Sequence, residues 1–335
     1  MVILFTNSLF YIRGIFLKKY LKIVVVFILI ISCLTLTSCT KTEKEQKILD
    51  KEMVFSFEHP QTKQKYKIIY ANQLFYPYIE KVKDNPNLST SETLELYNNE
   101  IIQPIYQDCF ENGEYLHMAE NLLNTIPNGL TEIEVVSEKM ETRKAEINQL
   151  IQESLLKSAD LLPSQSDVAV CVFPSSTNNR GAFAVGAGKI IIPLNLNGLG
   201  DALKSIVAHE YHHSVWAEKH ANGDRFSVLD NMVFEGKAVM FEKSVYPVYD
   251  YTPIYLTYNK VLWSKVKPDL KNYDSNRSLE ILNGGKGLPI SYGYSEGYKM
   301  VKSYLDLNPD KTPEEWTALS AKEIFEKGNY LENYK

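Results

Sequence analysis

The spacing of apolar and polar positions changes along the chain, and its first part is mainly helical. Alternation within residues 53–70 predicts a short β-hairpin. From about residue 72 to residue 159 the apolar positions recur with the period of an α-helix, most clearly over 131–159. The stripe of that segment consists of Ile133, Val136, Met140, Ile147, Leu150 and Leu155. A coiled coil is the alternative, but the stripe is short and breaks at Arg143 and Lys144. We expect a helix that packs on the domain after it.

The middle of the chain mixes strands and helices. Residues 167–173, DVAVCVF, predict a buried strand, and residues 182–193 are strand-like with a bend at Gly186–Gly188. A helix then begins with Asp201 as its N-cap and runs to about Lys219.

Helices dominate the remainder. A second helix is expected over about 228–243 and another from near Tyr294, while the segment up to Leu288 has no clear period. Thr312 and Ser320 each begin a capping box. These elements predict an α+β fold, in which a small mixed or antiparallel sheet carries one helix and the rest of the chain is mostly helical.

The first 39 residues form a separate segment. Four basic residues between Arg13 and Lys22 precede an apolar run, 23–36, which is too short for a comfortable membrane span but suits a signal peptide. The run ends in Leu36-Thr37-Ser38-Cys39, which resembles a bacterial lipobox, in which the cysteine is lipidated and becomes the mature N-terminus. We therefore expect a protein outside the cytoplasm, anchored to a bacterial membrane through Cys39. The alternative is an uncleaved anchor in which Cys39 is incidental.

Composition narrows the possible partners. The chain has 335 residues and a formal net charge of −5, which leaves no basic field for nucleic acid, so no nucleic-acid partner is expected. Cys33 belongs to the signal peptide and Cys39 to the lipobox, so only Cys109 and Cys171 remain. They could form one disulfide or be two buried small apolar residues, and the sequence does not decide between these.

A candidate metal site begins in the run His209-Glu210-Tyr211-His212-His213. His209 and His213 are four residues apart in an expected helix, so both imidazoles can reach one ion at ~2.0–2.1 Å. Glu210 is rotated by about 100°, which lets it address a water at the metal rather than the metal itself. An ordinary histidine pair is the alternative, but the apolar flanks predict burial, where unpartnered His and Glu are costly. His212 faces away and is not expected to be a ligand.

The third ligand decides the class of site. His220 would lie about 10 Å further along the helix than His213, too far for the same ion. Glu235 is the better candidate, because it follows His213 by 22 residues on the next expected helix, where Gly236 lets two helices approach closely. Glu242, two turns further on, is the runner-up.

Three segments resemble a bacterial family of predicted zinc-dependent proteases: HEYHHSV at 209–215, DNMVFEGKAVMFE at 230–242 and GYSEGYKMV at 293–301. The likeness extends from about residue 72 to the C-terminus. More broadly it resembles gluzincins, which hold zinc with two histidines of H-E-x-x-H and a glutamate from the following helix. The resemblance implies a zincin-like fold, peptidase activity and one Zn²⁺ ion. It also implies that residues 183–192 form the upper edge of the cleft and bind a peptide by strand addition.

A zinc peptidase also needs a donor for the oxyanion of its intermediate. We choose Tyr294 from the cluster Tyr292, Tyr294 and Tyr298, because Gly293 frees the backbone before it, although core packing is the alternative. The expected function is a zinc metallopeptidase acting on peptides or proteins, with Glu210 as general base. The alternatives are a zinc-binding lipoprotein without catalysis and a zinc hydrolase for a non-peptide amide. The expected organisation is a signal peptide over 1–38, a tether over 39–52, a mostly helical region over 53–160 and a catalytic region over 161–335.

Overall fold

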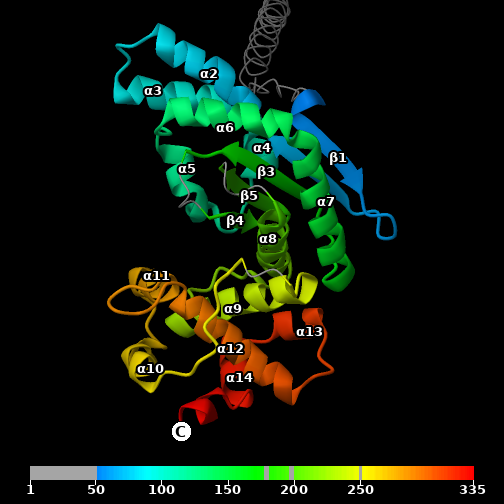
Figure 1. The fold of residues 1–335 in the computed structure, drawn as a ribbon, viewed down its shortest axis with the longest axis vertical. Helices are drawn as coiled ribbons and strands as arrows, with labels where there is room; N and C mark the ends of the chain where they lie inside the picture. Colours follow the sequence, from blue (N-terminus) through cyan, green and yellow to red (C-terminus); the bar gives the residue numbers. More distant parts are fainter. Residues whose placement is uncertain (1–50, 177–180, 196–199, 249–250) are drawn as a thin grey trace, which may run out of the picture. The chain divides into compact units, whose positions relative to one another are not determined.

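The computed structural model describes residues 51–176, 181–195, 200–248 and 251–335 (Figure 1). The expected signal peptide and Cys39 lie outside these residues. Leu49–Lys335 form one compact unit. Among the described helices, none combines the length and the apolar character that crossing a membrane requires.

A five-stranded mixed sheet lies at the centre of this unit, with the strand order β1-β2-β3-β5-β4. The strands are β1 (Val54–Glu58), β2 (Lys65–Tyr70), β3 (Val168–Pro174), β4 (Phe183–Gly186) and β5 (Lys189–Leu194). β1 and β4 pair antiparallel with their neighbours, whereas β2, β3 and β5 run parallel to one another. The α+β class, the hairpin at 53–70 and the strand at 167–173 are confirmed.

The expected edge strand over 183–192 is shorter than predicted. The chain reverses at Gly186–Gly188, so β4 alone lies at the edge and β5 is covered by β3 and β4. A Cβ on Gly188, whose φ is +67°, would lie 2.1 Å from Asp167 O, so glycine is needed where the hairpin turns beside the start of β3.

Both faces of the sheet are covered, because β3 is buried throughout. Its alternate residues, such as Val170 and Cys171, enter two different hydrophobic cores. Cys171 faces η3 (Asn98–Ile102), η4 (Leu116–Ala119) and the helices α2 (Asn72–Asp84), α3 (Thr90–Tyr97), α4 (Gln103–Cys109) and α5 (Glu120–Asn124). Val170 faces α7 (Lys144–Leu161) and α8 (Asp201–His220).

The expected single helix over 131–159 is wrong. It is two helices, α6 (Leu130–Thr142) and α7, which meet at a sharp angle (Figure 1). Arg143, with φ −109° and ψ 13°, leaves the helical conformation where the apolar stripe breaks. Met140 before the bend and Ile147 after it belong to the same hydrophobic core as Val170.

A third core joins the C-terminal helices. They are α9 (Val228–Val245), α10 (Lys260–Val266), α11 (Ser275–Asn283), α12 (Tyr292–Leu307) and α14 (Ala321–Lys327), with the short turns η5 (Lys267–Asp269) and η6 (Tyr330–Tyr334). Between α12 and α14 lies α13 (Pro313–Ala318), whose Trp316 belongs to the same core as Val170. The capping box at Thr312 is confirmed. Ser320 accepts from Glu323 N–H, but the carboxylate of Glu323 binds Lys327, so that box is incomplete.

Asp201 is not the N-cap of α8. Gly200 holds that position with φ +131°, a conformation that favours glycine. Asp201 is instead the first helical residue, and its carboxylate lies 3.6 Å from Lys204 Nζ.

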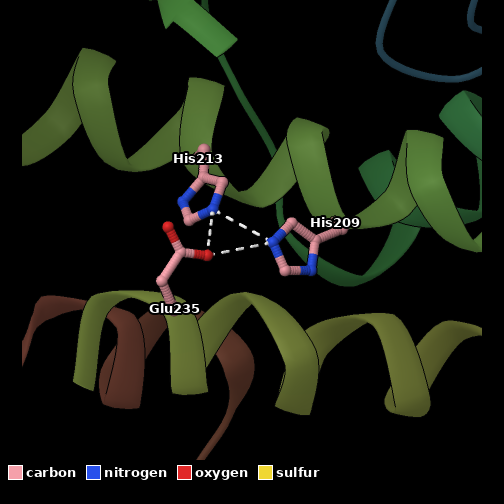
Figure 2. A group of neighbouring side chains, drawn as sticks. All are labelled: His209, His213 and Glu235. Atoms are coloured by element: carbon pink, nitrogen blue, oxygen red, sulfur yellow. Dashed lines mark hydrogen bonds and ion pairs between the residues drawn. The ribbon is translucent and has the colours of Figure 1, made fainter. Parts of the chain in front are cut away.

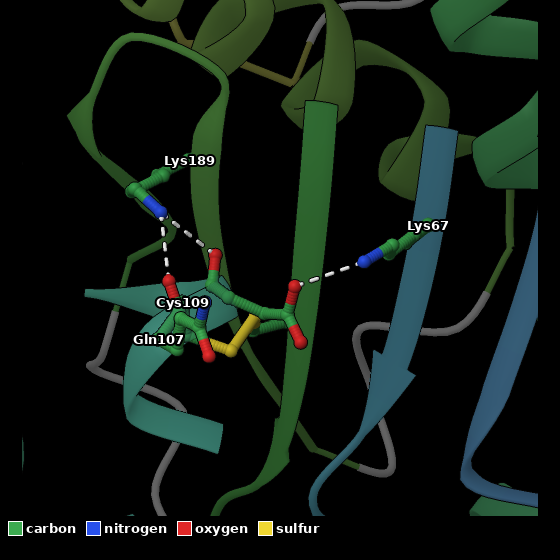
Figure 3. The surroundings of a disulfide bond; sticks show 6 residues. Lys67, Gln107, Cys109 and Lys189 are labelled. Atoms are coloured by element: carbon green, nitrogen blue, oxygen red, sulfur yellow. Dashed lines mark hydrogen bonds and ion pairs between the residues drawn. A yellow bond between two sulfur atoms is a disulfide. The ribbon is translucent and has the colours of Figure 1, made fainter. Parts of the chain in front are cut away.

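A disulfide joins Cys109, at the end of α4, to Cys171 on β3 (Figure 3). Lys189 Nζ donates to the carbonyls of Gln107 and Asp108 at 3.1 and 3.0 Å, so the end of α4 is also tied to β5. The pair is separated by 62 residues. In the chain-entropy account, closing a loop of that size stabilises the fold by about 4 kcal/mol.

Helices α9 and α12 touch through their backbones. A Cβ on Gly297 would lie 1.8 Å from Met232 O, and one on Gly236 would lie 2.1 Å from the carbonyl carbon of Gly297. Gly236 therefore does allow a close helix approach, and the partner is α12. This contact places Glu235 of α9 near the start of α12, where Tyr294 lies.

Gly297→Ala is expected to lower the free energy of unfolding by about 1–3 kcal/mol. The added methyl group meets backbone, which cannot move aside as a side chain can. Thermal unfolding should show a fall in Tm of roughly 2–10 °C. Gly181→Ala is the control, because its Cβ would meet nothing within 4 Å. Equal Tm values for the two variants would contradict a tight crossing.

Candidate active site

The histidine motif lies in the most enclosed part of α8. This helix packs between α7, α9 and β4, so every residue from His209 to Val215 is buried, as the apolar flanks predicted. The exposed fractions of His209, Glu210 and His213 are only 7%, 6% and 6%. Their remaining exposure opens onto one cavity, which all three line.

Three potential ligand atoms converge between α8 and α9 (Figure 2). His209 Nε2 and His213 Nε2 lie 3.2 Å apart, and Glu235 Oε2 lies 3.3 and 3.2 Å from them. Four ligands placed tetrahedrally at ~2.0–2.1 Å around zinc would be separated by roughly 3.3–3.4 Å. The spacing of these three atoms therefore fits one face of such a tetrahedron.

The charges of this cluster also fit a cation. Burial disfavours the charged form of His209, but hydrogen bonds with Glu235 and Glu242 outweigh it and raise the pKa of His209 to about 10. Burial likewise opposes ionisation of Glu235, yet His213 and His209 lower its pKa to about 2. Without a metal, the carboxylate thus faces a protonated imidazole, and a metal ion would displace that proton.

Glu242, the runner-up for third ligand, lies behind the cluster. It is fully buried, and its Oε2 lies 3.4 Å from His209 Nδ1, on the side of the ring away from Glu235. Thr252 Oγ1 donates to the same oxygen at 2.9 Å. A carboxylate at this position fixes the histidine tautomer that leaves Nε2 free for a metal. The sequence did not indicate Thr252, because it lies in the segment without a period.

Glu210 points into the cavity beside the three ligand atoms. Its carboxylate accepts a hydrogen bond from Ala184 N–H of β4, and its Oε2 has no hydrogen-bond partner among the described residues. Burial raises the pKa of Glu210, against the effect of His209 and His213. A buried carboxylate oxygen without a partner is costly, and such exceptions are typical of sites that bind a ligand or water.

Tyr294 lines the same cavity from the first turn of α12. Its ring centroid is 6.3 Å from that of His209. Burial, reinforced by the carboxylates of Glu235 and Glu210, raises the pKa of Tyr294 well above its ordinary value, so the phenol stays a hydrogen-bond donor. Gly293 acts here through its small size, because a Cβ would lie 2.8 Å from the Cα of Leu282.

The other candidates lie elsewhere. His212 is fully buried, stacks on Trp316 and lies 3.2 Å from Thr317 Oγ1. Burial holds the pKa of His212 well below its usual value, so it is neutral. His220 packs against Trp216, outside the convergent group. Tyr292 belongs to the third hydrophobic core.

The cavity in front of these groups has a volume of about 450 Å³. Its walls come from η4, β4, α8, α9, α11 and α12, together with the loops that precede α9 and α11. A concave site of this size with a few convergent polar groups is typical of a small-molecule or peptide site.

An α+β fold with H-E-x-x-H on one helix and a glutamate on the next has the layout of zinc-dependent hydrolases. The family described as "Predicted Zn-dependent protease (DUF2268)" matches residues 147–326, which is more than half of the chain. The chain belongs to this family, which confirms the resemblance noted from the sequence over residues 147–326, a shorter stretch than the one expected from residue 72 to the C-terminus. No curated protein and no solved structure matches significantly.

Proposed function

We propose that this protein is a zinc metallopeptidase that hydrolyses peptide bonds, with Glu210 as its general base. The main support is the convergence of His209 Nε2, His213 Nε2 and Glu235 Oε2 at tetrahedral spacing beside the free oxygen of Glu210. These three side chains would hold one zinc ion. When bound, zinc supplies a positive charge that polarises a carbonyl and makes water acidic near neutral pH.

Glu210 performs the proton transfers. Its unpartnered Oε2 accepts the proton of the attacking water and later delivers it to the leaving amine. The hydrogen bond from Ala184 N–H holds the carboxylate in place during both steps. Tyr294 donates a hydrogen bond to the carbonyl oxygen as negative charge develops on it.

The edge of β4 aligns the substrate. Tyr115 N–H donates to Val185 O at 2.8 Å, and the Glu114 carboxylate accepts from Ala187 N–H at 2.8 Å, so the far end of β4 is covered. Ala182, Phe183 and Ala184 line the cavity. An extended peptide can pair with this short stretch. A backbone edge beside the candidate ligands favours a peptide over a non-peptide amide.

Purified protein should contain one zinc per chain and cleave an unfolded protein substrate. A chelator should stop the cleavage, and added zinc should restore it. A zinc-loaded protein that cleaves no member of a broad peptide library would favour a zinc-binding lipoprotein without catalysis. Cleavage confined to non-peptide amides would favour a zinc hydrolase that acts on such amides.

We also propose that the mature protein is anchored outside the cytoplasm through Cys39. The Cys109–Cys171 disulfide supports this location, since disulfides persist mainly in oxidising compartments. The lipobox supports the anchor itself.

Cys39→Ala is expected to leave an unprocessed precursor or to release the protein from the membrane fraction, because the lipidated side chain is missing. Membrane fractionation and the mass of the N-terminus measure both effects. Cys33→Ala is the matched control, since Cys33 would leave with the signal peptide. Processing and anchoring of Cys39→Ala like the parent would overturn the lipoprotein proposal.

A further inference from the structure

We propose that the cavity selects polypeptide segments with a large apolar side chain next to the scissile bond, seated between Leu279 and Phe226. This inference rests on the proposed peptidase function and adds the substrate class. Leu279, Phe226 and Tyr273 come from three segments that meet only in the folded protein, and all three line the cavity.

The first wall is the exposed face of α11. Leu279 lines the cavity although 53% of it is exposed. Leu282 follows it by one helical turn on the same face and is buried against Gly293, next to Tyr294. The apolar stripe of α11 therefore continues from the core into the cavity, up to the proposed oxyanion donor. A large exposed aliphatic side chain that lines a cavity is typical of a surface that an apolar part of a ligand covers.

The second wall is aromatic and begins at the ring of His213, a candidate metal ligand. Phe234 stacks on His213, with ring centroids 4.2 Å apart and an interplanar angle of 23°. Phe226 packs edge-on against Phe234 and against Trp216, at 5.4 and 5.5 Å. These contacts hold Phe226 at the cavity in a fixed orientation. A side chain seated on Phe226 would belong to a residue close to the reacting carbonyl.

The charges around this part of the cavity do not favour a charged side chain. Arg225 lies over the ring of Tyr273 at 5.7 Å and donates to Tyr273 O at 3.2 Å. Asp224, of opposite sign, is its neighbour in the same cavity wall. Asn231 Nδ2 donates to Ser227 O and Ser278 Oγ, so its amide is engaged in holding α9 and α11 together. The cavity thus offers large apolar surfaces without a dominant charge.

The part of the cavity wall that η4 and β4 form has the same apolar character. Met118 of η4 is 50% exposed and lines the cavity, and Phe183 lies at the edge of β4. A methionine adapts its shape to different apolar partners. A segment that pairs with β4 must be extended, so the substrate class is unfolded polypeptide or peptide rather than a folded surface.

The test compares Leu279→Glu with Leu307→Glu in the zinc-loaded protein. The two leucines are equally exposed, at 53% and 54%, but Leu307 ends α12 and does not line the cavity. A peptide library digested by the parent and read by mass spectrometry should show cleavage next to Leu, Phe, Tyr or Met. Leu279→Glu should lower kcat/KM for such peptides at least about tenfold and raise cleavage next to Lys and Arg.

Leu307→Glu should have the same kcat/KM and the same cleavage specificity as the parent, and all three proteins should contain equal amounts of zinc. A parent that cleaves without any apolar preference would overturn the inference while the peptidase proposal stands, as would equal specificity of the two variants. If the zinc-loaded parent cleaves nothing, the peptidase proposal fails. Binding of Phe-rich against Lys-rich peptides then tests the apolar site alone: a preference lost in Leu279→Glu supports it, and equal binding overturns it.

Discussion

Glu210→Gln is expected to hydrolyse peptides about 10²–10⁴ times more slowly than the parent while it binds zinc equally well. The amide keeps the shape of the side chain but cannot accept the proton of the attacking water. It also cannot return a proton to the leaving amine, so one substitution removes both transfers. The three proposed ligands are untouched, and the removal of a buried carboxylate with an unpartnered oxygen should not destabilise the fold.

Zinc content, Tm and kcat for one peptide measure this prediction together. Glu95→Gln is a charge-matched control, because Glu95 is exposed on α3. The kcat of Tyr294→Phe should lie between those of the control and Glu210→Gln. The substitution removes one oxyanion donor, which lowers kcat on the order of 10²–10³-fold. Undiminished cleavage by Glu210→Gln would refute the mechanism, whereas loss of zinc would mean that Glu210 has a structural role at the ligands.

The helical part of the site could be predicted because helix geometry is local. A spacing of four residues is enough to place His209 and His213 on one face, whatever surrounds the helix. Glu235 could be predicted because its apolar neighbours indicated a buried helix directly after α8. Tertiary contacts decided the position of Glu242: its carboxylate lies beside Nδ1 of His209 rather than beside Nε2, where the other potential ligands converge.

The cavity walls could not be predicted, because they depend on contacts between distant segments. Leu279, Phe226 and Tyr273 come from loops and a short helix in which no apolar period stood out. The backbone contact of Gly236 with Gly297 joins residues about sixty positions apart, and each glycine alone is consistent with many roles. The pairing of Cys109 with Cys171 likewise needed the positions of α4 and β3.

The sheet shows the same limit. Residues 182–193 have the composition of a strand, and the glycine bend was visible, but only the fold shows that the bend reverses the chain. The reversal buries β5 and leaves β4 at the edge. Tyr115 then covers part of β4, so a segment far away in the sequence reduces the edge that a peptide can reach.

Glu235→Ala is expected to weaken zinc binding by about 10²–10³-fold. The free energy of binding structural zinc is ~10–16 kcal/mol, and each of the three proposed ligands contributes a large part of it. His213→Ala should have a similar effect. Glu242→Ala should cost less, about 10–100-fold, since it removes only the carboxylate that orients His209. Competition with a chromophoric chelator at fixed pH gives all three affinities, and thermal unfolding with and without zinc checks that the apo proteins remain folded.

Which of the two glutamate variants loses more zinc affinity shows whether the metal lies at Nε2 or at Nδ1 of His209. Glu235 Oε2 contacts the Nε2 atoms of both histidines, whereas the one histidine nitrogen that Glu242 Oε2 contacts among the described residues is His209 Nδ1. A metal at the convergent atoms therefore loses a ligand in Glu235→Ala but keeps all three in Glu242→Ala. If Glu242→Ala loses zinc while Glu235→Ala retains it at one ion per chain, Glu242 is the third ligand and His209 binds through Nδ1. That outcome would move the metal away from Glu210 and would remove the basis of the proposed mechanism.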